Sequence, residues 1–173
     1  MSMPRVSEAA LIALVVVAAW SDLRTRKIPN WITVSGAAVA LGLHIFYGGA
    51  SGAIRSLAGA TLGLAIFIAL YAAGGMGAGD VKLFSAVGAF LGPQALILAF
   101  IFTGLIGGVA GLALALWRGR LRETLKRTRE VLIDAGTLRW QQMRERAASP
   151  KSLRLPYGAV IAGGTLVSLF VLR

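Results

Sequence analysis

Short polar stretches divide this chain into six apolar runs. Most of them approach the roughly 20 residues that a tilted helix needs to cross a bilayer, although two are shorter. A chain of 173 residues, of which 57% are hydrophobic and 14% charged, has too little polar surface for a soluble globule of its size. We therefore predict an all-α integral membrane protein, a polytopic bundle of about six transmembrane helices. The predicted spans are residues 9–20, 31–47, 57–73, 81–91, 95–117 and 155–172.

The basic residues are clustered, which argues against a nucleic-acid partner despite the net charge of +11. Eleven of the 18 lysines and arginines lie in residues 118–154, and a second group lies in residues 24–27. Charge clustered in this way marks cytoplasmic segments. Trp20, Trp31 and Trp117 fall at the same predicted ends, as rings that prefer the headgroup level do. We expect both ends of the chain to lie outside the cytoplasm.

The first apolar run has a second interpretation, a secretory signal peptide. A signal peptide carries its positive charge before the apolar run. Here Arg5 stands alone before the run, whereas three basic residues follow it in residues 24–27. The charge pattern favours a retained transmembrane helix.

The basic segment at residues 118–154 is predicted to be a cytoplasmic loop of a single membrane-embedded domain over residues 1–173. Leucines recur in it at near-helical spacing with arginines between them, which is typical of an amphipathic helix on a membrane surface. We expect this loop to contact membrane lipids, most favourably anionic ones. A docking surface for a substrate is the alternative.

Carboxylates are almost absent from the first two thirds of the chain. After Glu8, the only acids in the first 122 residues are Asp22 and Asp80. Each adjoins an apolar run, where an unpaired charge is costly and usually functional, and the predicted topology puts both on the cytoplasmic side. Either acid alone could cap a helix or pair with a basic neighbour. Their placement at one membrane face favours a joint role.

Amide hydrolysis is a reaction that uses two such acids. One ionised carboxylate takes a proton from water while the second, protonated, donates to the carbonyl oxygen. Four glycines in residues 74–79 precede Asp80, and without side chains they let an extended peptide approach the backbone. We therefore name Asp22 and Asp80 as candidate catalytic residues, and Gly77 and Gly79 as candidate substrate-binding residues.

The composition points away from metal and cofactor chemistry. The chain has no cysteine, and His44 alone cannot form a zinc site. The glycines before Asp80 loosely resemble a nucleotide-binding fingerprint, but no strand is predicted before them and the stretch near Ala99 that should hold an acid is apolar. We expect neither a metal nor a cofactor, and we leave His44 and Lys82 outside the catalytic set, with His44 as a packed or hydrogen-bonded helix residue.

Glycines also recur four residues apart within the predicted spans. This spacing lets helix backbones approach closely in lipid, where apolar contact alone gives little gain. We interpret it as packing within a compact bundle. The pairs are Gly59 with Gly63, Gly104 with Gly108, and Gly107 with Gly111.

Three motifs, in order along the chain, resemble those of the type IV prepilin peptidases. Residues 76–83, MGAGDVKL, are similar to the GxGD signature of that family, and residues 22–30, DLRTRKIPN, resemble its first-aspartate segment. Residues 155–160, LPYGAV, resemble its last-span motif. The resemblance implies an aspartic endopeptidase that removes the basic leader of prepilins at the cytoplasmic face of the bacterial inner membrane. It also implies that Asp22 and Asp80 are the catalytic pair.

The chain differs from the longer members of the family that it resembles. Those enzymes carry a four-cysteine insertion and also N-methylate the new pilin terminus, whereas this chain has no cysteine and a nine-residue linker at residues 21–29. This difference argues against methyl transfer. The short architecture of the chain resembles the CpaA or TadV type of peptidase, which serves tight-adherence (Flp) pili. The alternative function is a non-enzymatic membrane assembly or transport component. The oligomeric state and the individual prepilin stay open.

Overall fold

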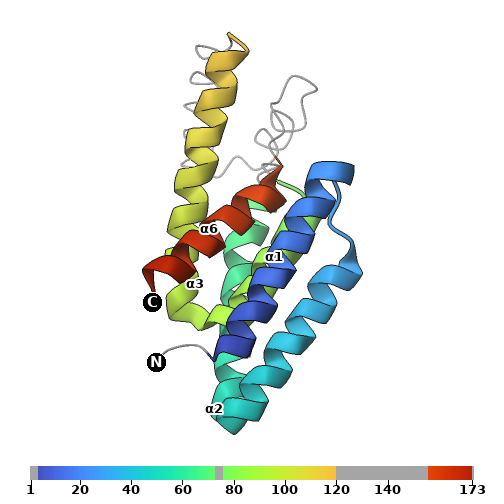
Figure 1. The fold of residues 1–173 in the computed structure, drawn as a ribbon, viewed down its shortest axis with the longest axis vertical. Coiled ribbons are helices and arrows are strands. Elements are labelled where there is room, and N and C mark those ends of the chain that lie inside the picture. Colours follow the sequence, from blue (N-terminus) through green and yellow to red (C-terminus); the bar gives the residue numbers. More distant parts are fainter. Residues whose placement is uncertain (1–3, 73–75, 120–155, 173) are drawn as a thin grey trace.

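A computed structural model of the protein describes residues 4–72, 76–119 and 156–172. The described residues form four helices. They are α1 (Arg5–Thr25), α2 (Asn30–Ala72), α3 (Ala78–Trp117) and α6 (Tyr157–Val171) (Figure 1). The first three are long and apolar enough to cross a membrane, and α6 is apolar but shorter. These ranges contain no strand, so the all-α prediction is confirmed for them.

The predicted count of six helices is not confirmed, because α2 and α3 continue through positions predicted as turns. Each is interrupted at one glycine with a non-helical backbone, Gly49 (φ 56°, ψ −139°) in α2 and Gly92 (φ 75°, ψ 172°) in α3. Glycine tolerates positive φ because it has no Cβ. Each long helix therefore consists of two helical segments. We call residues 78–91 and 93–117 the first and second segments of α3.

The break in α3 leaves backbone groups that lipid cannot satisfy, and side chains from α2 lie against it. Pro93 follows Gly92 and has no amide proton to donate to the preceding turn. The Nε2 atom of His44 lies 2.9 Å from the carbonyl oxygen of Phe90 and donates a hydrogen bond to it. The side chain of Arg55 lies against Gly92. His44 is thus a hydrogen-bonded helix residue, as predicted.

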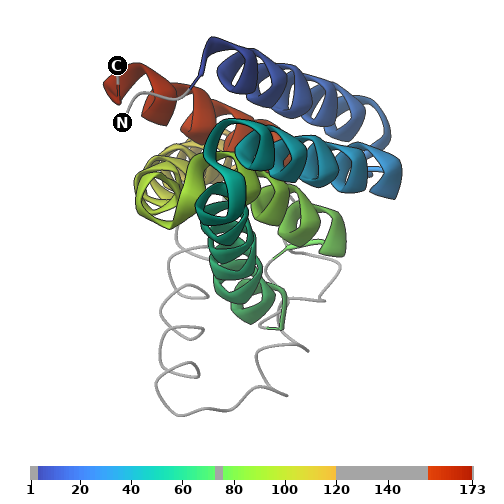
Figure 2. The ribbon, with the colours of Figure 1, turned by 90° about the horizontal axis from the view of Figure 1, so that it is seen from below.

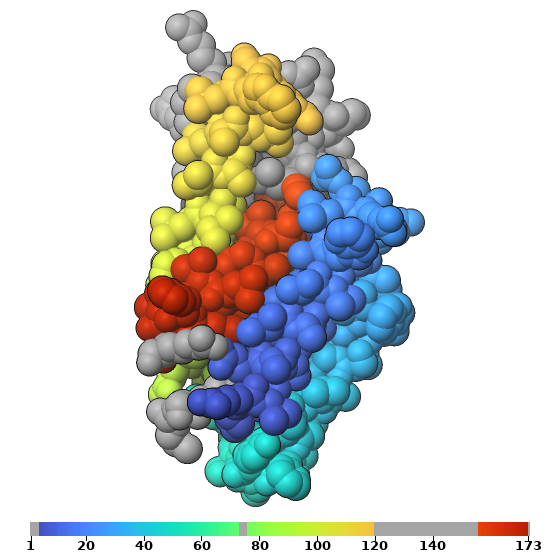
Figure 3. Space-filling model, viewed as in Figure 1, coloured from blue at the N-terminus to red at the C-terminus, as the bar shows by residue number. Residues whose placement is uncertain are grey.

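The first segment of α3 lies at the centre of the bundle. It is buried over most of its length, and α3 contacts each of the other three helices (Figure 2). On the face drawn in Figure 3, α6 lies between α1 and the second segment of α3. The start of α6 is therefore next to the end of α1, and these two helices run in opposite directions (Figure 1).

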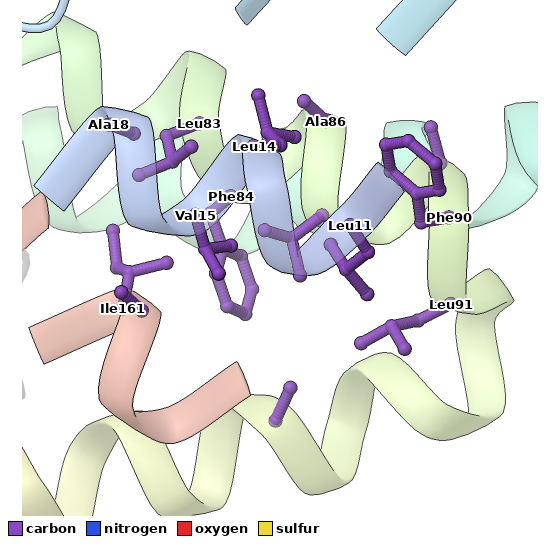
Figure 4. Close-up of a cluster of buried hydrophobic side chains, with 14 of the residues drawn as sticks. Leu11, Leu14, Val15, Ala18, Leu83, Phe84, Ala86, Phe90, Leu91 and Ile161 are labelled. Atoms are coloured by element: carbon purple, nitrogen blue, oxygen red, sulfur yellow. The ribbon is translucent and has the colours of Figure 1, made fainter. Parts of the chain in front are cut away.

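The core joins α1, the first segment of α3 and α6. Leu11 and Val15 of α1, Leu83 of α3 and Ile161 of α6 are fully buried and face one another (Figure 4). On the other side of α3, the rings of Phe67 and Phe84 stack with centroids 3.9 Å apart, and Phe100 packs edge-on against both. This packing fixes α3 between the first and last helices and the end of α2.

The glycine pairs behave differently from one another. Gly59 packs on the carbonyl group of Gly88, and a Cβ at Gly63 would lie 2.8 Å from the carbonyl oxygen of Phe84, so the packing prediction is confirmed for this pair. At Gly104 and Gly108 a Cβ would meet nothing within 4 Å, so the prediction is wrong for that pair. The second pair faces open space.

The predicted linker at residues 21–29 is too long. Helix α1 continues to Thr25, so that only residues 26–29 connect α1 to α2. Asp22 therefore lies in the last turn of a helix and not in a loop. The predicted basic loop at 118–154 lies outside the described residues, apart from its first two positions.

Candidate active site

Asp22 is held at the end of α1 by the way that helix terminates. Its backbone carbonyl accepts a 2.8 Å hydrogen bond from the amide of Arg26, which adopts a left-handed conformation (φ 54°) and ends the helix. The hydroxyl groups of Ser21 and Thr25 donate to the carbonyl of Lys27 and fix the turn that follows. The side chain of Asp22 points inward and is only 7% exposed.

The partner of the Asp22 carboxylate comes from the other end of the chain. Oδ2 of Asp22 accepts a 2.8 Å hydrogen bond from the backbone amide of Gly158, in the first turn of α6. A Cβ at Gly158 would lie 2.8 Å from Cβ and 3.0 Å from Oδ2 of Asp22, so only glycine permits this approach. The sequence contained one signal for this contact, the glycine after Pro156 and Tyr157, but the residues alone do not connect it to Asp22.

Asp80 occupies the first turn of α3 and is 8% exposed. Its Oδ2 atom accepts a 3.0 Å hydrogen bond from the amide of Gly77, which begins the helix. This contact is one half of a capping box, and the N-terminal end of the helix dipole favours a negative charge there. Asp80 therefore has the capping role that was considered for it, in addition to any chemical role.

The two acids come together at one end of the bundle. The end of α1, the start of α3 and the start of α6 converge there (Figure 1). Asp22 and Asp80 are close enough to interact electrostatically, and Tyr157 also lies within electrostatic range of Asp80. The expectation that the two scarce acids lie on the same side of the bundle is thus met, although they belong to helices that are separated by the whole of α2.

The short linker between α1 and α2 packs on the start of α3. A Cβ at Gly79 would lie 3.2 Å from Cβ of Ile28. Nζ of Lys82 donates a 2.9 Å hydrogen bond to Oδ1 of Asn30. These contacts connect the segment that contains Asp22 to the segment that contains Asp80. The sequence does not reveal these contacts, since neither residue pair shares a helix face.

Two basic neighbours of the acids, Lys82 and Arg24, make other contacts. Lys82 bonds Asn30, and the guanidinium of Arg24 lies 5.1 Å from the ring centroid of Trp20. The glycine-rich turn is described from Met76 onward, and Gly74 and Gly75 lie outside the described residues. Of the two candidate substrate-binding glycines, Gly77 donates its amide to Asp80 and Gly79 packs on Ile28.

The arrangement is suited to acid and base chemistry. Each acid is positioned by a hydrogen bond to a backbone amide through Oδ2, and both side chains are buried at a polar end of an apolar bundle. The two carboxylates lie within electrostatic range of each other. Within the described residues, no group of three or more histidines and acids could hold a metal ion.

Comparison with known proteins identifies the family. Residues 9–112 match the model of the type IV leader peptidase family, and this match includes Asp22, Asp80 and both candidate glycines. A prepilin leader peptidase/N-methyltransferase of Bacillus subtilis is 37% identical over 119 residues, which cover 64% of this chain and 44% of the relative. A protein of the same name from Burkholderia pseudomallei is 33% identical over 125 residues, covering 66% of this chain and 37% of the relative.

The matched region spans less than half of the length of these relatives. No solved structure matches the chain. The family match nevertheless covers more than half of the chain and includes both acidic segments. This protein belongs to the type IV leader peptidase family.

Proposed function

We propose that the protein is a membrane aspartic endopeptidase that cleaves the basic leader peptide from type IV prepilins, with Asp22 and Asp80 as its catalytic pair. The observation that supports this most directly is the convergence of two scarce, buried acids at one end of the bundle, each positioned by a backbone amide. The family match supports the substrate class.

The two acids divide the work of hydrolysis. The ionised carboxylate takes a proton from a water molecule as its oxygen attacks the scissile carbonyl carbon, and the protonated carboxyl donates its proton to the carbonyl oxygen. Collapse of the tetrahedral intermediate breaks the C–N bond, and a proton passes to the leaving amine. The hydrogen bonds from Gly77 and Gly158 engage Oδ2 of each acid, so Oδ1 is the atom that serves water or substrate. Gly77 and Gly79 offer a backbone without side chains to the extended peptide.

The site belongs at the cytoplasmic face of the bacterial inner membrane. The clustering of basic residues supports this orientation. Exposed tryptophan rings support it as well, because they lie at the helix ends nearest the acids or the basic segment. These rings are Trp20 in α1 (62% exposed), Trp31 in α2 (69%) and Trp117 in α3 (88%). With the breaks at Gly49 and Gly92, α2 and α3 would each cross the bilayer twice, giving about six spans with α1 and α6.

The connection between α1 and α2, residues 26–29, supports a finer specificity, because it is too short to hold the four-cysteine insertion of the longer family members. Residues 1–173 would form one peptidase domain for prepilins of the tight-adherence (Flp) type, without methyl transfer. The basic loop at 118–154 would rest on anionic lipids. The remaining candidate function is a non-enzymatic assembly or transport component, which the capping contact of Asp80 would suit.

Co-expression with a Flp-type prepilin tests this proposal. The N-terminal mass of the pilin is measured for the wild type, Asp22→Asn, Asp80→Asn and the control Glu8→Gln, an acid at the opposite end of α1. We expect leader removal by the wild type and the control and none by the two Asn variants at equal membrane levels. Asparagine still accepts a hydrogen bond, so both Asn variants should remain folded. Leader removal by either Asn variant would contradict the paired-acid mechanism, and the absence of leader removal by the wild type would favour the non-enzymatic function.

A further inference from the structure

Tyr157 places a phenol ring beside the acid pair. It is the first residue of α6 and follows Pro156, which caps that helix. The peptide group between Tyr157 and Gly158 supplies the amide that donates a 2.8 Å hydrogen bond to Oδ2 of Asp22. The backbone of Tyr157 is therefore fixed against Asp22 by a contact that belongs to the candidate active site.

The side chain of Tyr157 lies on the Asp80 side of the site. It lines a cavity of about 320 Å³ together with Met76, and the amide of the next residue, Gly77, donates to Oδ2 of Asp80. The phenol and the Asp80 carboxylate interact electrostatically, but no hydrogen bond joins these two described side chains. A gap therefore separates them. Tyr157 thus adjoins Asp22 through its backbone and approaches Asp80 through its ring.

Burial distinguishes Tyr157 from the aromatic rings that lie at the membrane interface. Trp31 and Trp117 are mostly exposed, as rings that meet lipid headgroups should be. Tyr157 is only partly exposed, and Phe67 and Val160 line the same cavity. Its position inside the bundle, next to both acids, indicates a role for its hydroxyl group beyond anchoring the helix in the membrane.

Hydrolysis creates a need for hydrogen-bond donors at this end of the bundle. The scissile carbonyl oxygen becomes negative as water attacks, and a donor held ready for it is worth far more in an apolar site than in water. The amides of Gly77 and Gly158 are already engaged by the two carboxylates. The Nζ atom of Lys82 donates to Asn30. These contacts do not involve the phenol of Tyr157, which is a donor close to Asp80.

We propose that Tyr157 is a third catalytic residue, whose phenolic hydroxyl donates a hydrogen bond to the scissile carbonyl oxygen beside Asp80. The phenol keeps its proton, because the protonated carboxyl of the acid pair is the group that transfers one to this oxygen. The phenol stabilises the negative charge during that transfer. A neutral donor suits an apolar site, since burial of a cation would cost more. This inference rests on the proposed function and adds to it a group that acts in the transition state.

Tyr157→Phe removes the hydroxyl and keeps the ring, so it tests chemistry separately from packing. Leader removal from a Flp-type prepilin is measured with purified protein in liposomes over a range of prepilin concentrations. We expect kcat to fall about 100-fold, as for loss of an oxyanion donor, with KM within about twofold of the wild-type value. The control is Tyr47→Phe, at an exposed tyrosine of α2, which should keep both wild-type values.

Binding of a tetrahedral mimic gives a second readout that does not depend on turnover. A prepilin peptide in which a secondary alcohol replaces the scissile carbonyl presents an oxygen in the geometry of the intermediate. Its affinity for Tyr157→Phe should be about tenfold or more below its affinity for the wild type. In the inactive Asp80→Asn background, the unaltered prepilin should bind equally well with and without Tyr157→Phe, because the hydroxyl acts on the transition state.

The outcomes separate this role from the peptidase assignment. A wild-type kcat for Tyr157→Phe, with or without a raised KM, would overturn the catalytic role and leave Tyr157 as a packing or substrate-binding residue. If Asp22→Asn is inactive in the same assay, the peptidase assignment stands. Failure of the wild type to cleave the prepilin, together with equal affinity of the wild type and Tyr157→Phe for the mimic, would remove both proposals.

Discussion

The backbone amide of Gly158 donates a 2.8 Å hydrogen bond to Oδ2 of Asp22, although 136 positions separate the two residues. The contact joins the first turn of the last helix to the last turn of the first helix. It also determines the direction of the Asp22 carboxylate, because the amide belongs to rigid backbone. The position of α6 thus becomes part of the geometry of the candidate active site.

Adding a single methyl group at Gly158 should disturb this geometry. In Gly158→Ala the new Cβ would lie 2.8 Å from Cβ of Asp22, so the carboxylate or the helix must shift. A displacement near 1 Å at a catalytic group reduces rates by about 100-fold, and we expect a loss of roughly 10- to 100-fold in prepilin cleavage. The initial rate of leader removal by purified protein in liposomes measures it.

The control for this prediction lies on the same helix. In Gly163→Ala the new Cβ would meet Cδ1 of Ile106 at 3.4 Å, an ordinary contact, and this variant should retain the wild-type rate. Equal rates for Gly158→Ala and Gly163→Ala would show that the approach of Gly158 to Asp22 is not needed for catalysis.

The hydrogen bond between Asn30 and Lys82 should contribute modestly to the same site. Both side chains are exposed, so the 2.9 Å contact is worth about 0.5–1 kcal/mol, or two- to fivefold in rate if it helps to position Asp80. Cleavage by Asn30→Ala, Lys82→Met and the double variant measures this contribution. The double variant should lose no more than either single variant, because both remove one contact. Losses that multiply would mean that the two residues act separately.

Packing at Gly59 should determine the stability of the bundle. In Gly59→Ala the new methyl group would press into the carbonyl group of Gly88, at the contact between α2 and the first segment of α3. Overpacking of this kind costs about 1–3 kcal/mol. We expect a lower midpoint of thermal unfolding in detergent, whereas Gly42→Ala, which meets nothing within 4 Å, should leave the midpoint unchanged. A similar fall for both would point to a general intolerance of alanine.

The helical class and the two acids could be predicted because apolar length and scarce charge are local properties. The run before Asp22 and the run after Asp80 are visible in the sequence, and the structure brings the two acids together. The exact helix boundaries could not be predicted in the same way. Thr25 continues α1 beyond the expected end, because the hydroxyl contacts to Lys27 and the left-handed Arg26 determine where the helix stops.

The contacts that shape the site depend on tertiary packing and lie beyond pattern recognition. The bonds of Gly158 to Asp22 and of Lys82 to Asn30 join residues far apart in the sequence. The glycine pairs illustrate the same limit. Gly59 with Gly63 and Gly104 with Gly108 have one spacing, yet the first pair is packed and the second faces open space, since only the arrangement of the helices decides which faces meet.

Cleavage by the two single Asn variants and the double variant, purified and reconstituted with prepilin, tests the paired-acid mechanism most directly. Asn can accept the amide hydrogen bonds of Gly77 and Gly158, so Asp22→Asn and Asp80→Asn should remain folded. We expect each single variant to lose activity to the same background as the double variant, because groups that act as a unit are not additive. Substantial cleavage by either single variant would contradict the two-aspartate mechanism.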